Sequence, residues 1–473
     1  MVRAALAGLA LLIGCAAGPV SETRLGTLPE SFLEDRFQVS ANSRHVALVV
    51  ESDSGQAAVV DGRRGPWYGS IGRLELNDNG TFAYAATRGD TALVVRDGRE
   101  GPASRSIGAL AYSLDGKHLA YPAKQADGRW VMMVDGRQAA FHDEISWPAR
   151  DPGSARLAYS ARDGDSWRLV LDGAPGPGWD EINPPRFEDD GRLVYAARRG
   201  TDWRVFAGDS SWPSPGGLGG PVLAGATGGA AWVAVDSGRA RLVRNGVPGP
   251  ARDFIIELAA TPDLGTVACA ARDGGLWTVL VNDSPVARSN GPPLIRVAPN
   301  GRVAATIVRD DGRQAMLVDG AEHRPHAGVS EPVFSPDGSR LAYGVADGGL
   351  MAVVVDSDQH QYYEAVTRLE FSPDSRRFAY AALKAGRWRL VVDGEEGPWF
   401  DAILESPAFF GPDGNRVAYA AASGKTRFIY TDGQRLEPGY DGVRRPVFDG
   451  NDRLNLVALR GDTLLSVSRR LPD

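Results

Sequence analysis

The stretch that decides the fold spans residues 369–394 and reads LEFSPDSRRFAYAALKAGRWRLVVDG. Pro373 supplies the φ near about −65° that favours a turn after the first apolar run. Asp393-Gly394 tolerates the positive φ angles of a two-residue hairpin turn after the third run. The runs between these turns predict three consecutive short strands, over 369–371, 377–382 and 388–392. A weaker outer strand is expected after Gly397-Pro398, because proline is tolerated at a sheet edge.

The same order of strands and turns recurs along nearly the whole chain. Ser335-Pro336-Asp337-Gly338 and Gly411-Pro412-Asp413-Gly414 repeat the first turn. The second turn recurs with a spacing of 36 to 39 residues. It begins at Asp61, Asp97, Asp135, Asp172, Asp209, Asn245, Asp283, Asp319, Asp356, Asp393 and Asp432, and Asp209, Asp283 and Asp356 lack the following glycine. Four short strands per repeat predict an all-β fold built from propeller blades.

The second strand of each repeat indicates how the blades pack. It reads Leu119-Ala120-Tyr121, Leu341-Ala342-Tyr343 and Phe378-Ala379-Tyr380 in three copies. Side chains alternate between the two faces of a strand, so one face carries Leu and Tyr and the other carries Ala. Both faces are apolar and must be buried. We therefore expect the large face of one blade to pack on the small face of the next.

The repeat count is twelve, which leaves the arrangement of the blades open. Closed propellers usually have about four to eight blades, and twelve in one ring would leave roughly 30° of arc per blade and a wide central hole. We expect two tandem six-bladed propellers, over residues 31–245 and 246–473, joined near residues 236–256. Seven plus five blades is an alternative, and a single large ring is the least favoured. Residues 24–37 are expected to supply the strand that the last repeat lacks.

The N-terminus differs from the repeats. Arg3 precedes a short apolar run from Ala4 to Ile13, which is too short to span a bilayer as a helix and is typical of a cleaved signal peptide over residues 1–14. Gly14-Cys15 resembles the lipobox of bacterial lipoproteins. That resemblance implies lipid attachment at Cys15 and a lipidated tether over residues 15–30. Ala16 after the cysteine implies sorting to the outer membrane, facing the periplasm. An ordinary secretory signal is the alternative.

The turn and strand from Ser335 to Tyr343 resemble those of TolB-type, WD-repeat-like β-propellers of bacterial envelopes. This resemblance covers nearly all of the chain after residue 30 and implies a propeller in the cell envelope. Members of that group are platforms for protein interaction or gating domains in front of peptidases. The small α/β domain that precedes the TolB propeller is missing from this sequence. The resemblance assigns no individual binding residues.

Composition and motifs argue against several classes of function. The chain has a net charge of −7, whereas a nucleic-acid-binding protein usually carries an excess of basic residues on one face. The sequence contains no Gly-x-Ser-x-Gly, His-Glu-x-x-His, Walker or calcium-loop motif, so we expect no enzyme, metal or cofactor. His323 and His326 form the one close histidine pair, and a loop role is favoured over metal binding. Cys269 lies in an apolar strand pattern and is expected to be a buried, inert thiol.

Two sets of charged residues recur with the repeat. Aspartates follow the outer strand and are interpreted as turn caps or inter-blade links; they are Asp143, Asp180, Asp253, Asp401 and Asp441. Arginines end the second strand, where the loops gather on one face of a propeller; they are Arg88, Arg162, Arg198, Arg272, Arg309 and Arg460. Solvated arginines paired with neighbouring carboxylates are one interpretation.

The sharper hypothesis is that these arginines form a face that binds an envelope protein or polysaccharide, with membrane contact only through the lipid anchor. The function expected is therefore that of a non-enzymatic binding platform. The alternative is a propeller enzyme, such as a glycan lyase or hydrolase, with carboxylates in a central channel.

Overall fold

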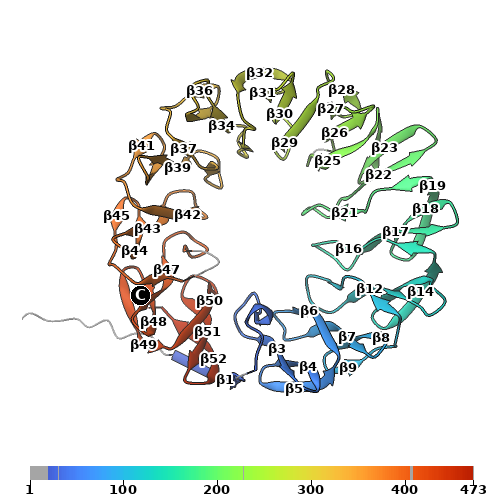
Figure 1. Ribbon diagram of the computed structural model, residues 1–473, viewed down its shortest axis with the longest axis horizontal. Coiled ribbons are helices and arrows are strands. Elements are labelled where there is room, and N and C mark those ends of the chain that lie inside the picture. Colours follow the sequence, from blue (N-terminus) through green and yellow to red (C-terminus); the bar gives the residue numbers. More distant parts are fainter. Residues whose placement is uncertain (1–19, 30, 227, 405–408, 472–473) are drawn as a thin grey trace, which may run out of the picture.

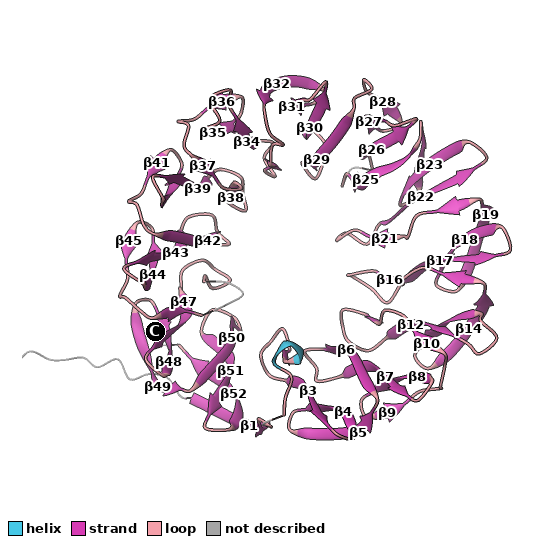
Figure 2. Ribbon diagram, viewed as in Figure 1, coloured by secondary structure: helices cyan, strands magenta, loops and turns pink. Residues whose placement is uncertain are grey.

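The computed structural model describes residues 20–29, 31–226, 228–404 and 409–471, and these residues form mainly short β-strands. The strands pair into twelve antiparallel sheets of four or five strands. Figure 1 shows the sheets arranged as blades around a wide central opening. One short 3-10 helix, η1 (Glu34–Arg36), occurs in the described part of the chain and lies beside this opening (Figure 2). The fold is a twelve-bladed β-propeller, which confirms the all-β class and the number of blades.

We number the blades 1 to 12 in chain order, starting at residue 38. The innermost strands face the central opening and are split in two in blades 3, 4, 5 and 9. They are β2 (Gln38–Val39), β6 (Ser70–Leu76), β10 (Ser106–Ile107) with β11 (Ala111–Tyr112), β15 (Glu144–Ile145) with β16 (Ala149–Arg150), β20 (Glu181–Ile182) with β21 (Arg186–Phe187), β25 (Gly217–Ala224), β29 (Phe254–Ala260), β33 (Ile295–Val297), β37 (Gly328–Val329) with β38 (Val333–Phe334), β42 (Ala365–Phe371), β46 (Ala402–Ile403) and β50 (Gly442–Phe448).

The second strand pairs with both the first and the third strand of each blade and carries several buried residues. The second strands are β3 (Val46–Ser52), β7 (Phe82–Arg88), β12 (Leu119–Lys124), β17 (Leu157–Asp163), β22 (Leu193–Arg199), β26 (Ala230–Asp236), β30 (Val267–Asp273), β34 (Val303–Val308), β39 (Leu341–Asp347), β43 (Phe378–Lys384), β47 (Ala418–Ser423) and β51 (Arg453–Arg460).

The third strand pairs with the second, and the outer strand closes the blade on the rim of the ring. The third strands are β4 (Gly55–Val60), β8 (Thr91–Arg96), β13 (Trp130–Val134), β18 (Ser166–Leu171), β23 (Asp202–Ala207), β27 (Arg239–Arg244), β31 (Leu276–Val281), β35 (Gln314–Val318), β40 (Leu350–Val355), β44 (Arg387–Val392), β48 (Thr426–Thr431) and β52 (Thr463–Arg470). The outer strands are β5 (Arg63–Tyr68), β9 (Arg99–Glu100), β14 (Arg137–His142), β19 (Ala174–Trp179), β24 (Ser210–Ser214), β28 (Val247–Pro248), β32 (Ser284–Ser289), β36 (Ala321–Glu322), β41 (Asp358–Gln359), β45 (Glu395–Glu396), β49 (Gln434–Tyr440) and β1 (Val20–Thr27).

The antiparallel order places the turns of every blade on two opposite faces of the ring. Turns between the first and second strands, and between the third and fourth, lie on one face, which we call the Asp-Gly face. Turns between the second and third strands, and the connections from one blade to the next, lie on the other, which we call the linker face.

Packing between blades follows the expected two-faced pattern. In blade 10, Tyr380 and Phe378 belong to one buried cluster with Ala342 and Val353 of blade 9. In blade 3, Leu119 and Tyr121 pack in the same way with Ala83 and Val94 of blade 2. The large face of one blade therefore lies on the small face of the preceding one, and each blade buries its surface only with its neighbours.

The arrangement differs from the expected pair of six-bladed propellers, because all twelve blades share one ring (Figure 1). The expected boundary near residues 236–256 falls in an ordinary seam, where Val233 and Leu242 of blade 6 pack with Ile255 and Cys269 of blade 7. Residues 31–245 and 246–473 thus form one continuous array. The physical reason is that one closing strand joins the last blade to the first, whereas two rings would each need their own closure.

That closing strand is β1, which pairs antiparallel with β52 and becomes the outer strand of blade 12. The sequence predicts a closing strand from the N-terminal segment, over residues 24–37. The structure confirms that this segment supplies the strand but places it at Val20–Thr27. The following segment runs beside blade 1, where Phe32 forms a bridge with Val50 and the Leu33 amide donates to the Val49 carbonyl. Residues 20–27 are therefore a strand of the ring, so a free tether over residues 15–30 is wrong for that part.

Candidate functional site

The residues that repeat on the Asp-Gly face hold the scaffold together. In ten blades an Asp or Asn with φ between 46° and 53° begins the hairpin turn, and its Oδ1 accepts the backbone N–H that opens the second strand. Asp393, for example, accepts from the Phe378 amide at 2.8 Å. In two turns the left-handed residue lies one position earlier than expected, at Gly208 and Asn282. Aspartate is needed at these turns for its side-chain acceptor as well as for its tolerance of positive φ.

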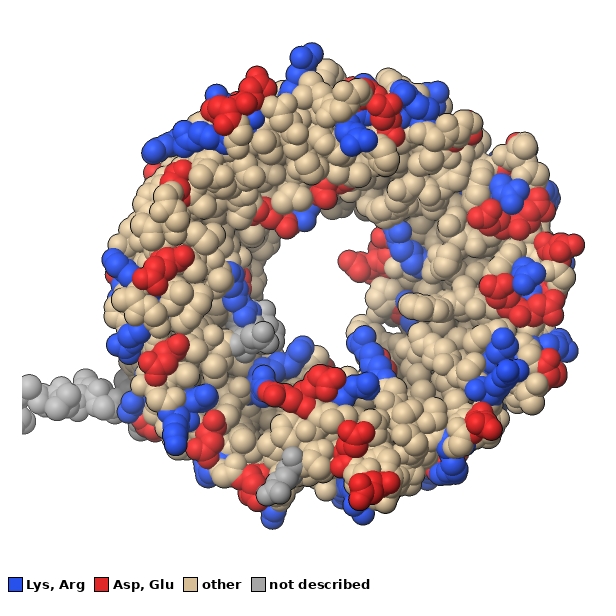
Figure 3. Space-filling view, viewed as in Figure 1, with Lys and Arg blue, Asp and Glu red and all other residues tan. Residues whose placement is uncertain are grey.

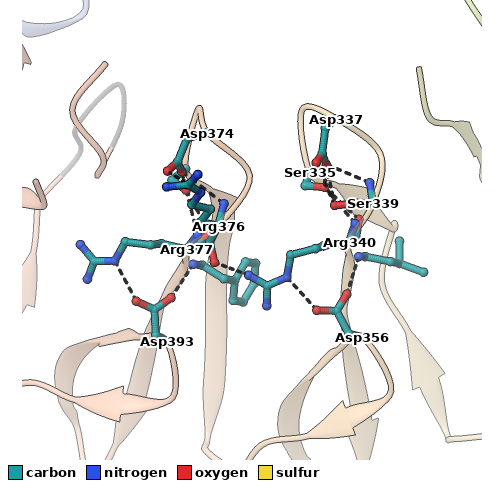
Figure 4. A network of polar contacts seen from close by, with 12 residues as sticks. Ser335, Asp337, Ser339, Arg340, Asp356, Asp374, Arg376, Arg377 and Asp393 are labelled. Carbon is teal, nitrogen blue, oxygen red and sulfur yellow. Dashed lines mark hydrogen bonds and ion pairs between the residues drawn. The ribbon is translucent and has the colours of Figure 1, made fainter. Parts of the chain in front are cut away.

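Arginines on the Asp-Gly face connect several blades to the next, as Figure 4 shows for blades 9 and 10. Arg340 pairs with Asp356 of its own blade at 2.8 Å and donates to the Arg376 carbonyl of the next blade at 2.6 Å. Arg377 repeats both contacts, with Asp393 and the Asn415 carbonyl. These recurring arginines and aspartates therefore stabilise the turns and the contacts between blades.

The six arginines predicted as a binding face lie at the linker-face ends of the second strands, but they do not converge. They are distributed over blades 2, 4, 5, 7, 8 and 12. Five of them pair with a glutamate of their own blade. The pairs are Arg88 with Glu100 (2.5 Å), Arg162 with Glu144 (2.9 Å), Arg198 with Glu181 (3.2 Å), Arg309 with Glu322, and Arg460 with Glu22 (2.8 Å). The geometry agrees with the interpretation of solvated arginines paired with neighbouring carboxylates. In these five pairs the carboxylate belongs to a glutamate.

Arg272 is the exception among these six. It has no ion pair with any residue in the described ranges, and its Nε makes no hydrogen bond there. Its guanidinium lies 4.8 Å from the Phe254 ring centroid and 5.6 Å from that of Trp277. Phe254 is 54% exposed. Arg272 therefore offers the best-placed free cation of the predicted set.

The recurring linker-face aspartates are turn caps, as one interpretation of the sequence held. Each accepts a hydrogen bond from the backbone amide of a glycine in the turn between the second and third strands. The pairs are Asp143 with Gly164, Asp180 with Gly200, Asp253 with Gly274, Asp401 with Gly424 and Asp441 with Gly461, at 2.6–2.9 Å. Their carboxylates are spread around the ring and form no common catalytic centre.

The histidine pair is split between two separate contacts. His326 is buried, and its Nδ1 lies 2.6 Å from Asp347, whereas His323 lies 3.0 Å from the Tyr343 hydroxyl. The hydrogen bond from His326, helped by the Ala327 amide, lowers the pKa of Asp347 to about 2. No group of three or more His, Cys, Asp or Glu side chains in the described ranges is arranged to hold a metal ion. Cys269 is buried, and burial raises the pKa of its thiol to about 12.

The residues that do not repeat gather on the innermost segments. Blades 2, 6, 7, 10 and 12 carry a β-bulge there, in addition to the four blades whose inner strand is split. Three bulge residues other than glycine have positive φ, and all three are charged: Glu257 (53°), Arg368 (58°) and Arg445 (46°). Trp147, in the loop between β15 and β16, is 74% exposed. Sequence reasoning missed these residues because it searched for what repeats.

Charged groups line the central opening, where Figure 3 shows acidic and basic side chains around the inner rim. Arg296 of blade 8 lies between carboxylates of two neighbouring blades, 3.3 Å from Glu257 and in contact with Glu331. Glu370 of β42 is also near this edge; burial raises its pKa, and it accepts a hydrogen bond from the Phe409 amide at 2.9 Å. One arginine thus bridges the two carboxylates, and Glu370 accepts a backbone amide and lies 3.8 Å from Arg368. This arrangement differs from the paired free carboxylates of a glycosidase.

A cavity of about 1580 Å³ lies at the inner edge where blades 10 to 12 meet blade 1. Its wall includes η1, the segment before it, and the bulges of β42 and β50. Arg368, Arg427, Arg444 and Arg445 contribute its positive charges. This cavity and the neighbouring opening are the candidate functional site.

Two predictions concern the N-terminus and lie beyond the described residues. Cys15, the predicted site of lipid attachment, is outside the described ranges, as is the predicted signal peptide. Within those ranges no helix is long and apolar enough to cross a membrane.

Comparisons with known proteins give a fold-level likeness only. No protein-family model matches the chain, and no curated protein matches its sequence. Similar solved structures include TolB from Acinetobacter baumannii (12% identity, TM-score 0.24, covering 62% of this chain and 80% of that chain). The Dos1 propeller is 9% identical with a TM-score of 0.31 and covers 96% of this chain and 95% of that chain. A eukaryotic initiation factor is 12% identical with a TM-score of 0.37, over 77% of this chain and 98% of that chain. At these values the likenesses identify no function, and the propeller fold rests on the strand arrangement itself.

Proposed function

We propose that this chain is a non-enzymatic scaffold of the bacterial cell envelope that binds a protein or polymer partner at the central opening of its ring. One observation carries the proposal: contacts within and between blades account for the recurring residues, whereas the residues that differ between blades gather on the innermost segments. Residues of a repeat protein that do not serve the scaffold are the ones available for binding.

The proposed place of attachment is the lipid on Cys15. The closing strand begins at Val20, five residues after this cysteine. Five residues span at most about 18 Å, so a lipid on Cys15 would hold the outer rim of blade 12 close to the membrane surface. Labelling cells with a clickable palmitate tests this: the chain should carry label, and Cys15→Ala should remove it. Label that persists in Cys15→Ala would contradict the proposal.

Site-specific photo-crosslinking in intact envelopes tests partner binding at the opening. A photo-reactive phenylalanine derivative replaces Trp147, which is 74% exposed on an innermost segment. The matched control carries the same derivative at Val247, which is 70% exposed on an outer strand. A discrete crosslinked species is expected at Trp147 and absent at Val247. Equal products at both positions, or none at Trp147, would refute binding at the opening.

The linker face has its own test at Arg272. Arg272→Glu removes the one cation of the predicted set without a carboxylate partner in the described ranges, and Arg162→Glu serves as the comparison because Arg162 already pairs with Glu144. If the partner also contacts the linker face, Arg272→Glu should reduce the amount of partner recovered in a pull-down from envelopes. Unchanged recovery with both variants would confine the partner to the opening.

A further inference from the structure

The cavity at the closure of the ring lies beside two short inner strands. The innermost strands β2 of blade 1 and β46 of blade 11 have two residues each, whereas β42 and β50 each have seven. Leu28, Phe32, Leu33 and helix η1 line the cavity on the side of blade 1. Its volume is about 1580 Å³, and the inner strands of blades 10 to 12 form its other wall.

Most of the cavity wall is apolar. The apolar lining residues come from the segment before blade 1, from β2 of blade 1, and from blades 11 and 12; they are Leu28, Phe32, Leu33, Phe37, Val39, Ile403, Leu404, Val443, Val457, Ala458, Leu459 and Leu464. Ligand pockets in proteins are commonly about 300–1,000 Å³ and mainly apolar, with a few placed polar groups. This cavity is large enough for a ligand with an extended apolar body.

The polar part of the wall carries more free positive than free negative charge. Glu34 lies 3.6 Å from Arg444 and Asp35 lies 3.6 Å from Arg36, whereas Asp441 accepts only the Gly461 amide. Arg368 lies 3.8 Å from Glu370. Arg427 and Arg445 form no ion pair with any residue of the described ranges, and Arg427 donates only to the Gly424 carbonyl, at 3.1 Å. A chain with a net charge of −7 thus presents unpaired arginines beside an apolar surface.

Two of the arginines are held in a backbone conformation that a residue with a side chain rarely adopts. Arg368 has φ of 58° and Arg445 has φ of 46°, each at a β-bulge of an innermost strand. Glycine adopts this conformation without steric cost, and it occupies many other left-handed positions in this chain. Bulges redirect side chains, and strained residues gather at ligand sites. Both of these arginines line the same cavity.

We propose that this cavity binds an anionic amphiphile, with its apolar body against Phe32, Phe37 and Val443 and its carboxylate or phosphate at Arg445; Arg368 and Arg427 line the same cavity. The inference goes beyond the scaffold role and does not depend on it, since the cavity can hold a small ligand whether or not a larger partner occupies the opening.

Isothermal titration calorimetry on the full chain carrying Cys15→Ala, purified without detergent, tests this proposal. Decanoate and decyl phosphate are the amphiphilic probes, decanol is the uncharged analogue, and acetate and inorganic phosphate lack the apolar body. Saturable binding of one decanoate or one decyl phosphate per chain is expected, at least tenfold tighter than decanol, acetate or phosphate. Equal affinity for decanol would refute the role of the arginines, and equal affinity for inorganic phosphate would refute the amphiphile.

Arg445→Gly provides the decisive variant, because glycine accepts a φ of 46° and removes only the side chain. It should melt at or above the wild-type temperature and bind the probes at least tenfold more weakly, whereas Arg445→Lys should retain most of the affinity. Ala385→Gly is the matched control, since Ala385 has φ of 52° in a linker-face turn outside the cavity. Full probe binding by Arg445→Gly would overturn the proposal, as would an equal loss in Ala385→Gly.

Discussion

The carboxylate of Glu22, in the closing strand β1, should stabilise the closure of the ring. It accepts two hydrogen bonds from the Arg460 guanidinium, each of 2.8 Å, and one of 3.0 Å from the Tyr440 hydroxyl. Arg460 also lies 5.3 Å from the Tyr440 ring centroid. These contacts tie the N-terminal segment to residues more than 400 positions away. We predict that Glu22→Gln loosens β1.

The size of the effect follows from the geometry. Glu22→Gln removes the charge and one of the two acceptor oxygens, so the paired arginine interaction is lost. Hydrogen bonds to charged groups contribute about 1.5–3 kcal/mol each when shielded, and less when exposed. The Glu22 side chain is 26% exposed and that of Arg460 is 49% exposed. We therefore expect a loss of about 2 kcal/mol, which corresponds to roughly 30-fold more frequent opening of β1.

Hydrogen exchange measured by mass spectrometry is the suitable assay, because a repeat array need not unfold in one step. Peptides covering β1 and β52 should exchange roughly 30-fold faster in Glu22→Gln. Glu100→Gln is the matched control, since Glu100 pairs with Arg88 of its own blade and Tyr68 of the preceding blade in the same way, and all strands of that blade follow one another in the chain. The reasoning fails if β1 keeps wild-type protection in Glu22→Gln, or if Glu100→Gln exposes β1 equally.

The closure should also depend on pH. The hydrogen bond from Arg460 lowers the pKa of Glu22 below its ordinary value of 4.5. A carboxylate with a lowered pKa in the folded state stabilises fully above its unfolded value, and this contribution is lost as the pH falls through the folded value. Protection of β1, corrected for intrinsic exchange, should therefore decline below about pH 4.5 in the wild type. It should change less in Glu22→Gln.

Three further predictions concern the blades. Asp393→Ala removes the acceptor of the Phe378 amide and the partner of Arg377, so it should cost about 1–2 kcal/mol in urea denaturation, while Asp393→Asn should cost less because an amide oxygen remains. Ala379→Leu overfills the small face of blade 10, where Ala379 is 0% exposed, and should lower stability by about 1–3 kcal/mol; an unchanged midpoint would contradict the seam packing. In a Cys15→Ala background, the Cys269 thiol should react with a disulfide reagent only as fast as the chain opens, because burial raises its pKa to about 12; rapid labelling of the native chain would disprove this.

The candidate site illustrates why sequence reasoning succeeded on the scaffold and failed on the cavity. Turn residues such as Asp393 act on amides only 15 positions away, so their role follows from local pattern. The cavity joins Phe32, Arg368 and Arg445, which come from three separate parts of the chain. The positive φ angles of Arg368 and Arg445 arise at bulges that the repeat does not encode, because an inserted residue shifts the register only locally.

The sequence by itself determined the blade: its four strands, its turns, its large and small faces, and the number of copies. These properties depend on contacts within one repeat or with the next, and a period of about 37 residues records them. Only the tertiary structure decided that twelve blades close one ring instead of two. The angle between neighbouring blades depends on side-chain packing along each whole seam, and small differences accumulate over twelve seams. Closure then required β1 to reach β52 from the opposite end of the chain.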